Sequence, residues 1–249
     1  MTQMLASVTS VEEALLALEL GADIIDLKNP HDGALGALPL ATLASIVIAI
    51  DGRRTVSATI GDTPDDPARI ARKVVATTAT GVDIVKIGIA TSRSQLAFWQ
   101  GKADLAGPRP ATGGEPEPAS TRLVAVLFAD KAFDLAWIDA LAERGFYGVM
   151  LDTVDKHAGG LRSHCDDAQL RNFVQRAHSK HLMCGLAGSL RLDDISPLLA
   201  LSPDYLGFRG ALCRNTSRTD QLDADAFRAV RARIFELHAT SEPFASSVA

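Results

Sequence analysis

The chain has 249 residues, of which 47% are hydrophobic and 22% are charged. Its net charge of −5 argues against a nucleic-acid-binding surface, which normally carries a basic excess. No apolar run is long enough to cross a bilayer, residues 1–7 lack the features of a secretory signal, and three widely spaced cysteines suit a reducing compartment, so we expect a cytoplasmic protein without membrane contact.

Eight short apolar runs have the length and composition of buried parallel strands. Amphipathic stretches separate them, and this alternation with short connections indicates a parallel sheet. Eight such units predict an α/β fold, a single (β/α)8 TIM barrel, since a doubly wound sheet would more usually have six strands. In chain order the predicted strands are Leu5–Val8, Ile24–Leu27, Thr55–Ile60, Ile84–Ile87, Leu123–Phe128, Gly148–Leu151, Leu182–Gly185 and Tyr205–Phe208.

Helices are predicted between these strands, several with clear end signals. Ser10 and Glu13 form the pattern of a capping box, and Gly21 is a typical helix terminator. Pro39 suits the first turn of the second helix. The predicted helices are Ser10–Leu20, one beginning at Pro39, Pro67–Thr80, Ser92–Gln100, Leu135–Arg144, Asp167–Lys180, Asp193–Leu201 and Asp223–Leu237.

Two segments are not expected to belong to the ordered barrel. Residues 101–121 are rich in Gly, Pro and Ala and carry too little apolar surface to fold, which predicts a flexible insertion. The insertion joins a helix to a strand and would therefore lie opposite the active end of a barrel. Residues 238–249 are expected to form a disordered tail. The barrel domain is accordingly predicted to span residues 1–237.

Charged residues stand at the carboxyl ends of two predicted strands that are otherwise apolar. Side chains alternate along a strand, so Asp26 and Lys28 share one face of the second strand and Leu27 occupies the other. With Leu27 facing the helices, Asp26 and Lys28 point into the barrel. Lys86 stands near the same end of the fourth strand. These groups are expected to converge at the active end of the barrel.

The fifth and sixth strands add further charges. The sixth is followed by Asp152, and Lys156 lies in the loop after it, whereas Lys131 lies beyond the apolar run of the fifth strand. A lysine at a strand end is often only a solvated residue or an ion-pair partner, and this alternative is strongest for Lys131. Lys28 and Lys86 lie within apolar strands beside carboxylates. A scaffold without activity has no reason to bury such charges.

Lysines in this position favour carbonyl chemistry. An amine attacks a carbonyl only when it is unprotonated, and burial or a nearby cation lowers the lysine pKa toward neutrality. Lys28 and Lys86 could lower each other's pKa in this way. A Schiff base on one of them would stabilise a carbanion, while Asp26 and Asp152 could transfer protons. The spacing of cysteine and histidine suggests no metal site.

The loops after the last two strands are candidates for phosphate binding. Glycine lets backbone N–H groups approach an anion, and in many barrels these two loops bind phosphate. Gly188 and Ser189 follow the seventh strand, and Gly210 follows the eighth. Arg209 could add a charged donor. The alternative is that these glycines serve only as turns.

Several of these motifs resemble the (5-formylfuran-3-yl)methyl phosphate synthase family of methanofuran biosynthesis. The resemblance covers nearly the whole barrel. It runs through Asp23–Pro30, Gly33–Gly36, Asp83–Gly88, Met150–Thr153 with Lys156, Gly185–Ser189 and Gly207–Gly210.

The resemblance implies an α/β barrel that joins two molecules of glyceraldehyde 3-phosphate, with loss of one phosphate and water, to give (5-formylfuran-3-yl)methyl phosphate. Such an enzyme is a lyase that acts on phosphates and serves one-carbon metabolism, and no cofactor or metal is implied. Lys28 would form the Schiff base and Lys86 would transfer protons. Asp26, Asp152 and Lys156 would complete the acid–base set. Lys131 is the nearest match to a further family lysine after the fifth strand.

Three other functions remain open at this point. Another Schiff-base aldolase, acting on a different small sugar phosphate, would form the same imine but no furan. An isomerase would use Lys28 only as an electrostatic clamp and would form no covalent adduct. A barrel without activity would serve as a subunit or binding module. The sequence carries no distinct interface signature, although barrels often associate into homo-oligomers.

Overall fold

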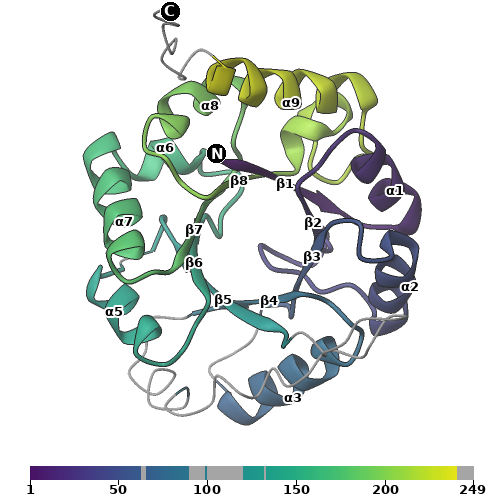
Figure 1. The fold of residues 1–249 in the computed structure, drawn as a ribbon, viewed down its shortest axis with the longest axis horizontal. Coiled ribbons are helices and arrows are strands. Elements are labelled where there is room, and N and C mark those ends of the chain that lie inside the picture. The colour runs from purple at the N-terminus through teal and green to yellow at the C-terminus, as the bar shows by residue number, and fades with distance from the viewer. Residues whose placement is uncertain (63–65, 90–98, 100–119, 132, 240–249) are drawn as a thin grey trace, which may run out of the picture.

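The computed structural model describes residues 1–62, 66–89, 99, 120–131 and 133–239. Within these residues eight parallel strands pair in chain order and close between the first and the last, as a ring of helices surrounds them (Figure 1). The predicted (β/α)8 barrel is therefore confirmed. The strands are β1 Gln3–Val8, β2 Ile24–Leu27, β3 Thr55–Thr59, β4 Ile84–Gly88, β5 Arg122–Phe128, β6 Gly148–Asp152, β7 Met183–Leu186 and β8 Tyr205–Phe208.

The helices match their predicted positions to within one or two residues. Of the predicted helix Ser92–Gln100 only Trp99 is described. Of the predicted insertion 101–121 and the predicted tail 238–249, residues 101–119 and 240–249 lie outside the described residues. The last helix continues to Ala239, two residues beyond the predicted end of the domain. The short elements α6, η2 and η3 were not predicted. The described helices are α1 Val11–Glu19, α2 Leu40–Ile50, α3 Pro67–Thr78, α5 Ala136–Ala142, α6 Leu161–His164, α7 Asp167–Ser179, α8 Leu192–Leu199 and α9 Ala224–Ala239, with the 3-10 turns η2 Gly210–Leu212 and η3 Arg214–Thr216.

The capping box predicted for the first helix forms only in half. The Ser10 hydroxyl accepts the Glu13 N–H at 3.3 Å. The Glu13 carboxylate, however, accepts the N–H and hydroxyl of Thr9 and the guanidinium of Arg209. The second half is therefore wrong, because a cation that follows β8 competes for this carboxylate. Glu13 thus connects α1 to Arg209, which follows β8.

Strand periodicity separates two apolar layers. Outward side chains such as Leu27 pack under the helices, and inward side chains such as Ile24, Ile84 and Tyr205 fill the barrel. Toward the carboxyl ends of the strands the inward positions become polar, with Asp26 beside Ser7 and Ser57 in register. An apolar floor therefore supports a polar upper layer.

Replacing Gly185 by alanine is expected to destabilise the barrel by about 2 kcal/mol, because overpacking forces neighbours apart. A Cβ at Gly185 would lie 2.1 Å from the Tyr205 ring. Urea unfolding would measure the loss. Combining Gly185→Ala with Tyr205→Leu should cost less than the sum of the single changes, since the shorter side chain leaves room. Additive effects would show that the ring does not limit this position.

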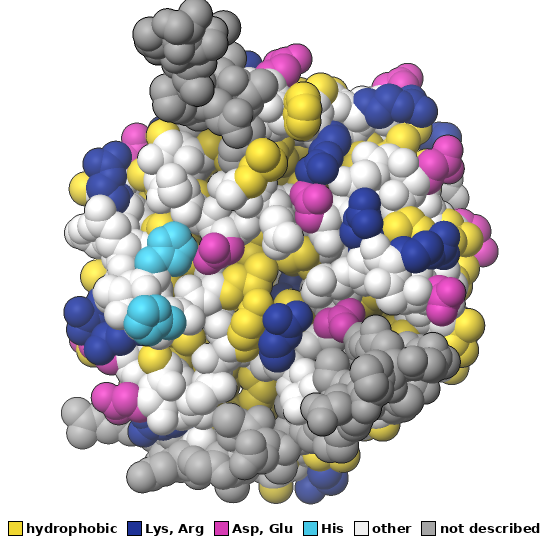
Figure 2. Space-filling model, viewed as in Figure 1, with side chains coloured by type: hydrophobic (Ala, Val, Ile, Leu, Met, Phe, Trp, Pro, Cys, Tyr) yellow, Lys and Arg dark blue, Asp and Glu magenta, His cyan; other side chains and the backbone are white. Residues whose placement is uncertain are grey.

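The face seen in Figure 2 shows Lys and Arg interspersed with Asp and Glu, without a large gathering of either sign. Hydrophobic side chains are also visible across its centre. Among the described residues, no helix is both long enough and apolar enough to span a membrane.

Candidate active site

Two buried ion pairs lie inside the carboxyl end of the barrel. Lys86 on β4 places its Nζ 2.6 Å from the Asp26 Oδ1 on β2. The hydroxyls of Ser7 and Ser57 donate to the two oxygens of the same carboxylate, at 2.9 and 2.7 Å. Asp26 is thus held by three strands besides its own. Neither serine was singled out in the sequence, although the strand register places both beside Asp26.

The second pair is centred on Asp152 at the end of β6. Its Oδ1 accepts the Lys156 ammonium at 2.5 Å and the Thr153 N–H at 2.7 Å. Its Oδ2 lies 3.5 Å from the Nζ of Lys28, which reaches across from β2. The structure therefore brings five of the six predicted catalytic residues together, namely Asp26, Lys28, Lys86, Asp152 and Lys156.

Burial and neighbouring charge shift the titration of this cluster. Burial lowers the pKa of Lys86, and the nearby Lys28 ammonium lowers it further, while Asp26 opposes both effects. Burial likewise lowers the pKa of Lys156, against the attraction of Asp152. Burial alone would raise the pKa of Asp152, but Lys156 and Lys28 hold it well below its ordinary value. The neutral amine needed for proton transfer is thus easier to reach than in free lysine.

Lys28 is the least tightly paired lysine of the cluster. Its shortest described contact to a carboxylate is 3.5 Å, compared with 2.6 Å for Lys86 and 2.5 Å for Lys156. Its side chain is 11% exposed, whereas that of Lys86 is 3% exposed. Lys28 is therefore the amine that is best placed to meet an incoming carbonyl group.

Lys131 forms none of the ion pairs described for the cluster carboxylates. It is exposed in the turn after β5, and its backbone N–H donates to the Phe128 carbonyl. The neighbouring Asp130 has a clearer structural role, since its carboxylate accepts the N–H groups of Val154 and Asp155. Asp130 thereby anchors the loop that carries Lys156, and no sequence signal indicated this.

The β2 loop closes over part of the barrel mouth. Leu35 is 2% exposed and belongs to the apolar cluster inside the barrel. A Cβ at Gly88, the inward position after Lys86, would lie 2.6 Å from the Leu35 Cδ1. The Thr59 hydroxyl donates to the Gly36 carbonyl at 2.9 Å and holds the loop down. Leu35 therefore covers the mouth on the side of Lys86.

The loop after β7 contains two consecutive residues in the left-handed region of backbone conformation. Gly188 and Ser189 both have positive φ, at 110° and 51°. In the described part of the chain their N–H groups donate to no protein acceptor. A Cβ at Gly188 would lie 3.0 Å from the Thr153 side chain, so the loop packs closely beside the end of β6. Gly210 begins the 3-10 turn η2 after β8.

The guanidinium of Arg209 does not fit its predicted part in phosphate binding. All five of its N–H donors are engaged by protein acceptors: the Glu13 carboxylate takes two, and the carbonyls of Ser7, Arg218 and Asp220 take the others. The sequence could not show this, because the pairing of Glu13 with Arg209 arises only when the chain folds. A second arginine of the same loop, Arg218, donates to the Gly33 carbonyl of the β2 loop and was not predicted.

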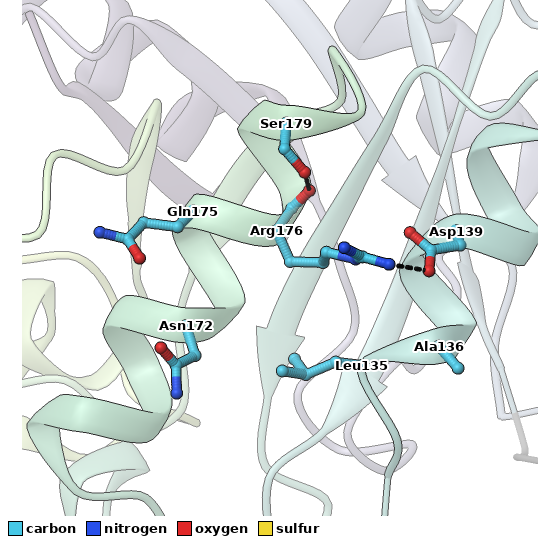
Figure 3. Close-up of a pocket in the computed structure, with 7 residues that line it drawn as sticks. All are labelled: Leu135, Ala136, Asp139, Asn172, Gln175, Arg176 and Ser179. Atoms are coloured by element: carbon cyan, nitrogen blue, oxygen red, sulfur yellow. Dashed lines mark hydrogen bonds and ion pairs between the residues drawn. The ribbon is translucent and has the colours of Figure 1, made fainter.

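A groove with a volume of about 420 Å³ lies on the outer surface between α5 and α7. Figure 3 shows Arg176 reaching across it to Asp139, with Leu135 and Asn172 also lining it. None of the site residues lines this groove. In the described ranges, no group of three or more His, Cys, Asp and Glu has the arrangement of a metal site.

Comparison with known sequences identifies close relatives. Residues 4–231 match the family described as 4-HFC-P synthase. A Methylorubrum extorquens protein, provisionally named (5-formylfuran-3-yl)methyl phosphate synthase, is 42% identical over 234 residues, which is 92% of each chain. The (5-formylfuran-3-yl)methyl phosphate synthase of Methanopyrus kandleri is 34% identical over 223 residues, covering 87% of this chain and 91% of its own.

Solved structures resemble the chain at the level of the fold. The 3-hexulose-6-phosphate synthase of Salmonella typhimurium gives a TM-score of 0.63 at 14% identity, covering 95% of this chain and all of its own. A sequence identity this low shows that the two proteins share the barrel fold, but it does not show that they share a reaction.

Proposed function

Because the chain belongs to the (5-formylfuran-3-yl)methyl phosphate synthase family, we propose that it makes (5-formylfuran-3-yl)methyl phosphate from two molecules of glyceraldehyde 3-phosphate, with loss of one phosphate and two molecules of water. The product serves methanofuran-type cofactor biosynthesis. The observation that supports this best is the cluster of three lysines and two carboxylates inside the barrel mouth.

The amine of Lys28 attacks the aldehyde of one substrate molecule, and the adduct loses water to form a protonated imine. The loose contact with Asp152 leaves this amine available, and the other lysines are held more tightly. The imine withdraws electrons, so that the neighbouring carbon loses a proton and becomes an enamine. The enamine supplies the electron pair needed either to expel phosphate or to attack a second aldehyde.

The two ion pairs supply the groups that transfer protons to and from this imine. Lys156 with Asp152 and Lys86 with Asp26 each join a buried amine to a carboxylate. The lowered pKa of each buried amine lets it give and take protons closer to neutral pH than a free lysine can. Gly188, Ser189 and Gly210 offer backbone N–H groups to the phosphate. Lys131 is exposed, and we assign it no role in the reaction.

Incubating the protein with glyceraldehyde 3-phosphate is expected to give a phosphorylated hydroxymethyl-furaldehyde and one released phosphate per product. Mass spectrometry would identify the furan and a phosphate assay would measure the ratio. A borohydride-trapped adduct without any furan would instead support a Schiff-base aldolase acting on another sugar phosphate. A folded protein that gives neither adduct nor product would contradict the proposal.

A further inference from the structure

The loop after β8 holds two arginines that use their N–H donors in opposite ways. The five donors of Arg209 are all occupied by protein acceptors. Arg218 makes one described hydrogen bond, from its Nη2 to the Gly33 carbonyl at 2.9 Å. Its remaining donors have no acceptor in the described part of the chain. Arg209 is therefore a structural arginine, whereas Arg218 retains donors for a ligand.

Arg218 connects the loop after β8 to the β2 loop, which covers part of the barrel mouth. Its side chain is partly buried, and its hydrogen bond to Gly33 places it against the β2 loop. Its charge interacts with that of Asp152 and contributes to the lowered pKa of Lys156. The Arg218 charge therefore acts on Asp152, the carboxylate that pairs with Lys28 and Lys156.

The balance of charge at this mouth favours an anion. Lys28, Lys86, Lys156 and Arg218 supply positive charge. The carboxylates that act on them are Asp26, Asp152 and Asp62, the last of these on Arg218. Positive groups therefore exceed negative ones in a chain whose net charge is −5. Burying an excess of one sign is costly unless a ligand balances it. An anionic group that enters the mouth supplies that balance.

Hydrogen bonds from Arg209 and to Glu13 hold the loop after β8 that carries Arg218. Arg209 donates through Nε to the Arg218 carbonyl at 2.9 Å, and Glu13 accepts the Leu222 N–H at 3.2 Å. Within the loop Thr216 has a φ of 54°, a strained value for a β-branched residue. Such strain persists only where surrounding contacts impose it. The Arg209–Glu13 pair supplies contacts of this kind.

We propose that Arg218 binds the phosphate group of the substrate, and that Arg209 and Glu13 are positioning residues that hold its loop. The identity of the substrate rests on the function proposed above, whereas the phosphate chemistry rests on the loop itself. A guanidinium presents paired donors that match two phosphate oxygens. In the proposed site Arg218 is the charged donor, and the N–H groups of Gly188 and Ser189 are neutral donors.

Titration with inorganic phosphate tests this site without any turnover. Replacing Arg218 by glutamine is expected to weaken phosphate binding about tenfold or more, because charge-assisted hydrogen bonds are the strong ones. Arg218→Lys should weaken it less, since a point charge remains. Arg214→Gln is the matched control: it is an exposed arginine of the same loop and should leave binding unchanged. Equal affinity of wild type and Arg218→Gln would overturn the proposal.

A pair of substrates separates phosphate recognition from a role in holding the β2 loop. Borohydride trapping would be measured with glyceraldehyde 3-phosphate and with glyceraldehyde. Arg218→Gln should raise the half-saturating concentration about tenfold for the phosphorylated aldehyde only. An equal effect on both aldehydes would overturn phosphate recognition. If wild type traps neither aldehyde, the Schiff-base function fails, while the phosphate titration still decides the role of Arg218.

Discussion

Replacing Lys28 by arginine is expected to abolish formation of the furan product and of the borohydride-trapped adduct. Arginine keeps the positive charge near Asp152, so the barrel should fold, but a guanidinium cannot form an imine. The loss should reach about a thousandfold or more, as when a nucleophile is removed from a group that acts as a unit. Mass spectrometry of the trapped protein and of the reaction mixture would measure both effects.

The matched control is Lys180→Arg. Lys180 follows α7 on the outside of the barrel, where its ammonium lies 3.4 Å from Asp139. This variant should retain full activity and the same trapped adduct. Substantial turnover by Lys28→Arg would rule out a Schiff base at this residue and would favour a role for Lys28 as an electrostatic clamp. Full biological activity of Lys28→Ala would point instead to a barrel that acts only as a scaffold.

Replacing Asp152 by asparagine is expected to lower both stability and activity. The side chain keeps its size but loses the charge that faces Lys28 and Lys156. Two buried ammonium groups would then lack their shared counter-charge, which costs about 3 kcal/mol. Turnover should fall by about a hundredfold or more, because the amine that transfers protons loses its partner. Urea unfolding at neutral pH and steady-state kinetics would measure these changes.

The stability difference should also depend on pH. Asp152 has its pKa lowered in the folded protein, so its contribution is complete above the ordinary carboxyl pKa of about 4 and is lost as the pH falls below that value. Wild type and Asp152→Asn should therefore converge in acid. Asp225→Asn is the control, since the exposed Asp225–Arg228 pair contributes little at any pH. Equal stability of wild type and Asp152→Asn at pH 7 would show that the Asp152 charge does not stabilise the buried Lys28 and Lys156.

The fold could be predicted because its signals are local. Each apolar run of four to six residues matches a strand, and the alternation of Asp26, Leu27 and Lys28 was enough to orient β2. The missed elements, such as η2, are short turns whose shape depends on contacts with distant segments. Glu13 shows the same limit, because its partner Arg209 is remote in sequence and reaches it only when the barrel closes.

The site residues that lie at the ends of strands could be predicted from the sequence. Lys28, Lys86 and Asp152 follow from side-chain alternation and from the common edge at which parallel strands end. Pairing was not predictable, since nothing local shows that Lys86 meets Asp26 and that Lys28 leans toward Asp152. The contrast between Arg209 and Arg218 is likewise a product of loop geometry, because both are arginines in one polar loop.

The clamped carboxylate of Asp26 has a consequence for the energetics of turnover. Hydroxyls of Ser7 and Ser57 and the ammonium of Lys86 hold its oxygens in place. In water, dipoles must reorient around each charge that forms or disappears, and that reorganisation energy is part of the barrier. Here the dipoles are oriented once, when the polypeptide folds. The cost of arranging them is thereby transferred from every catalytic cycle to the marginal stability of the native state.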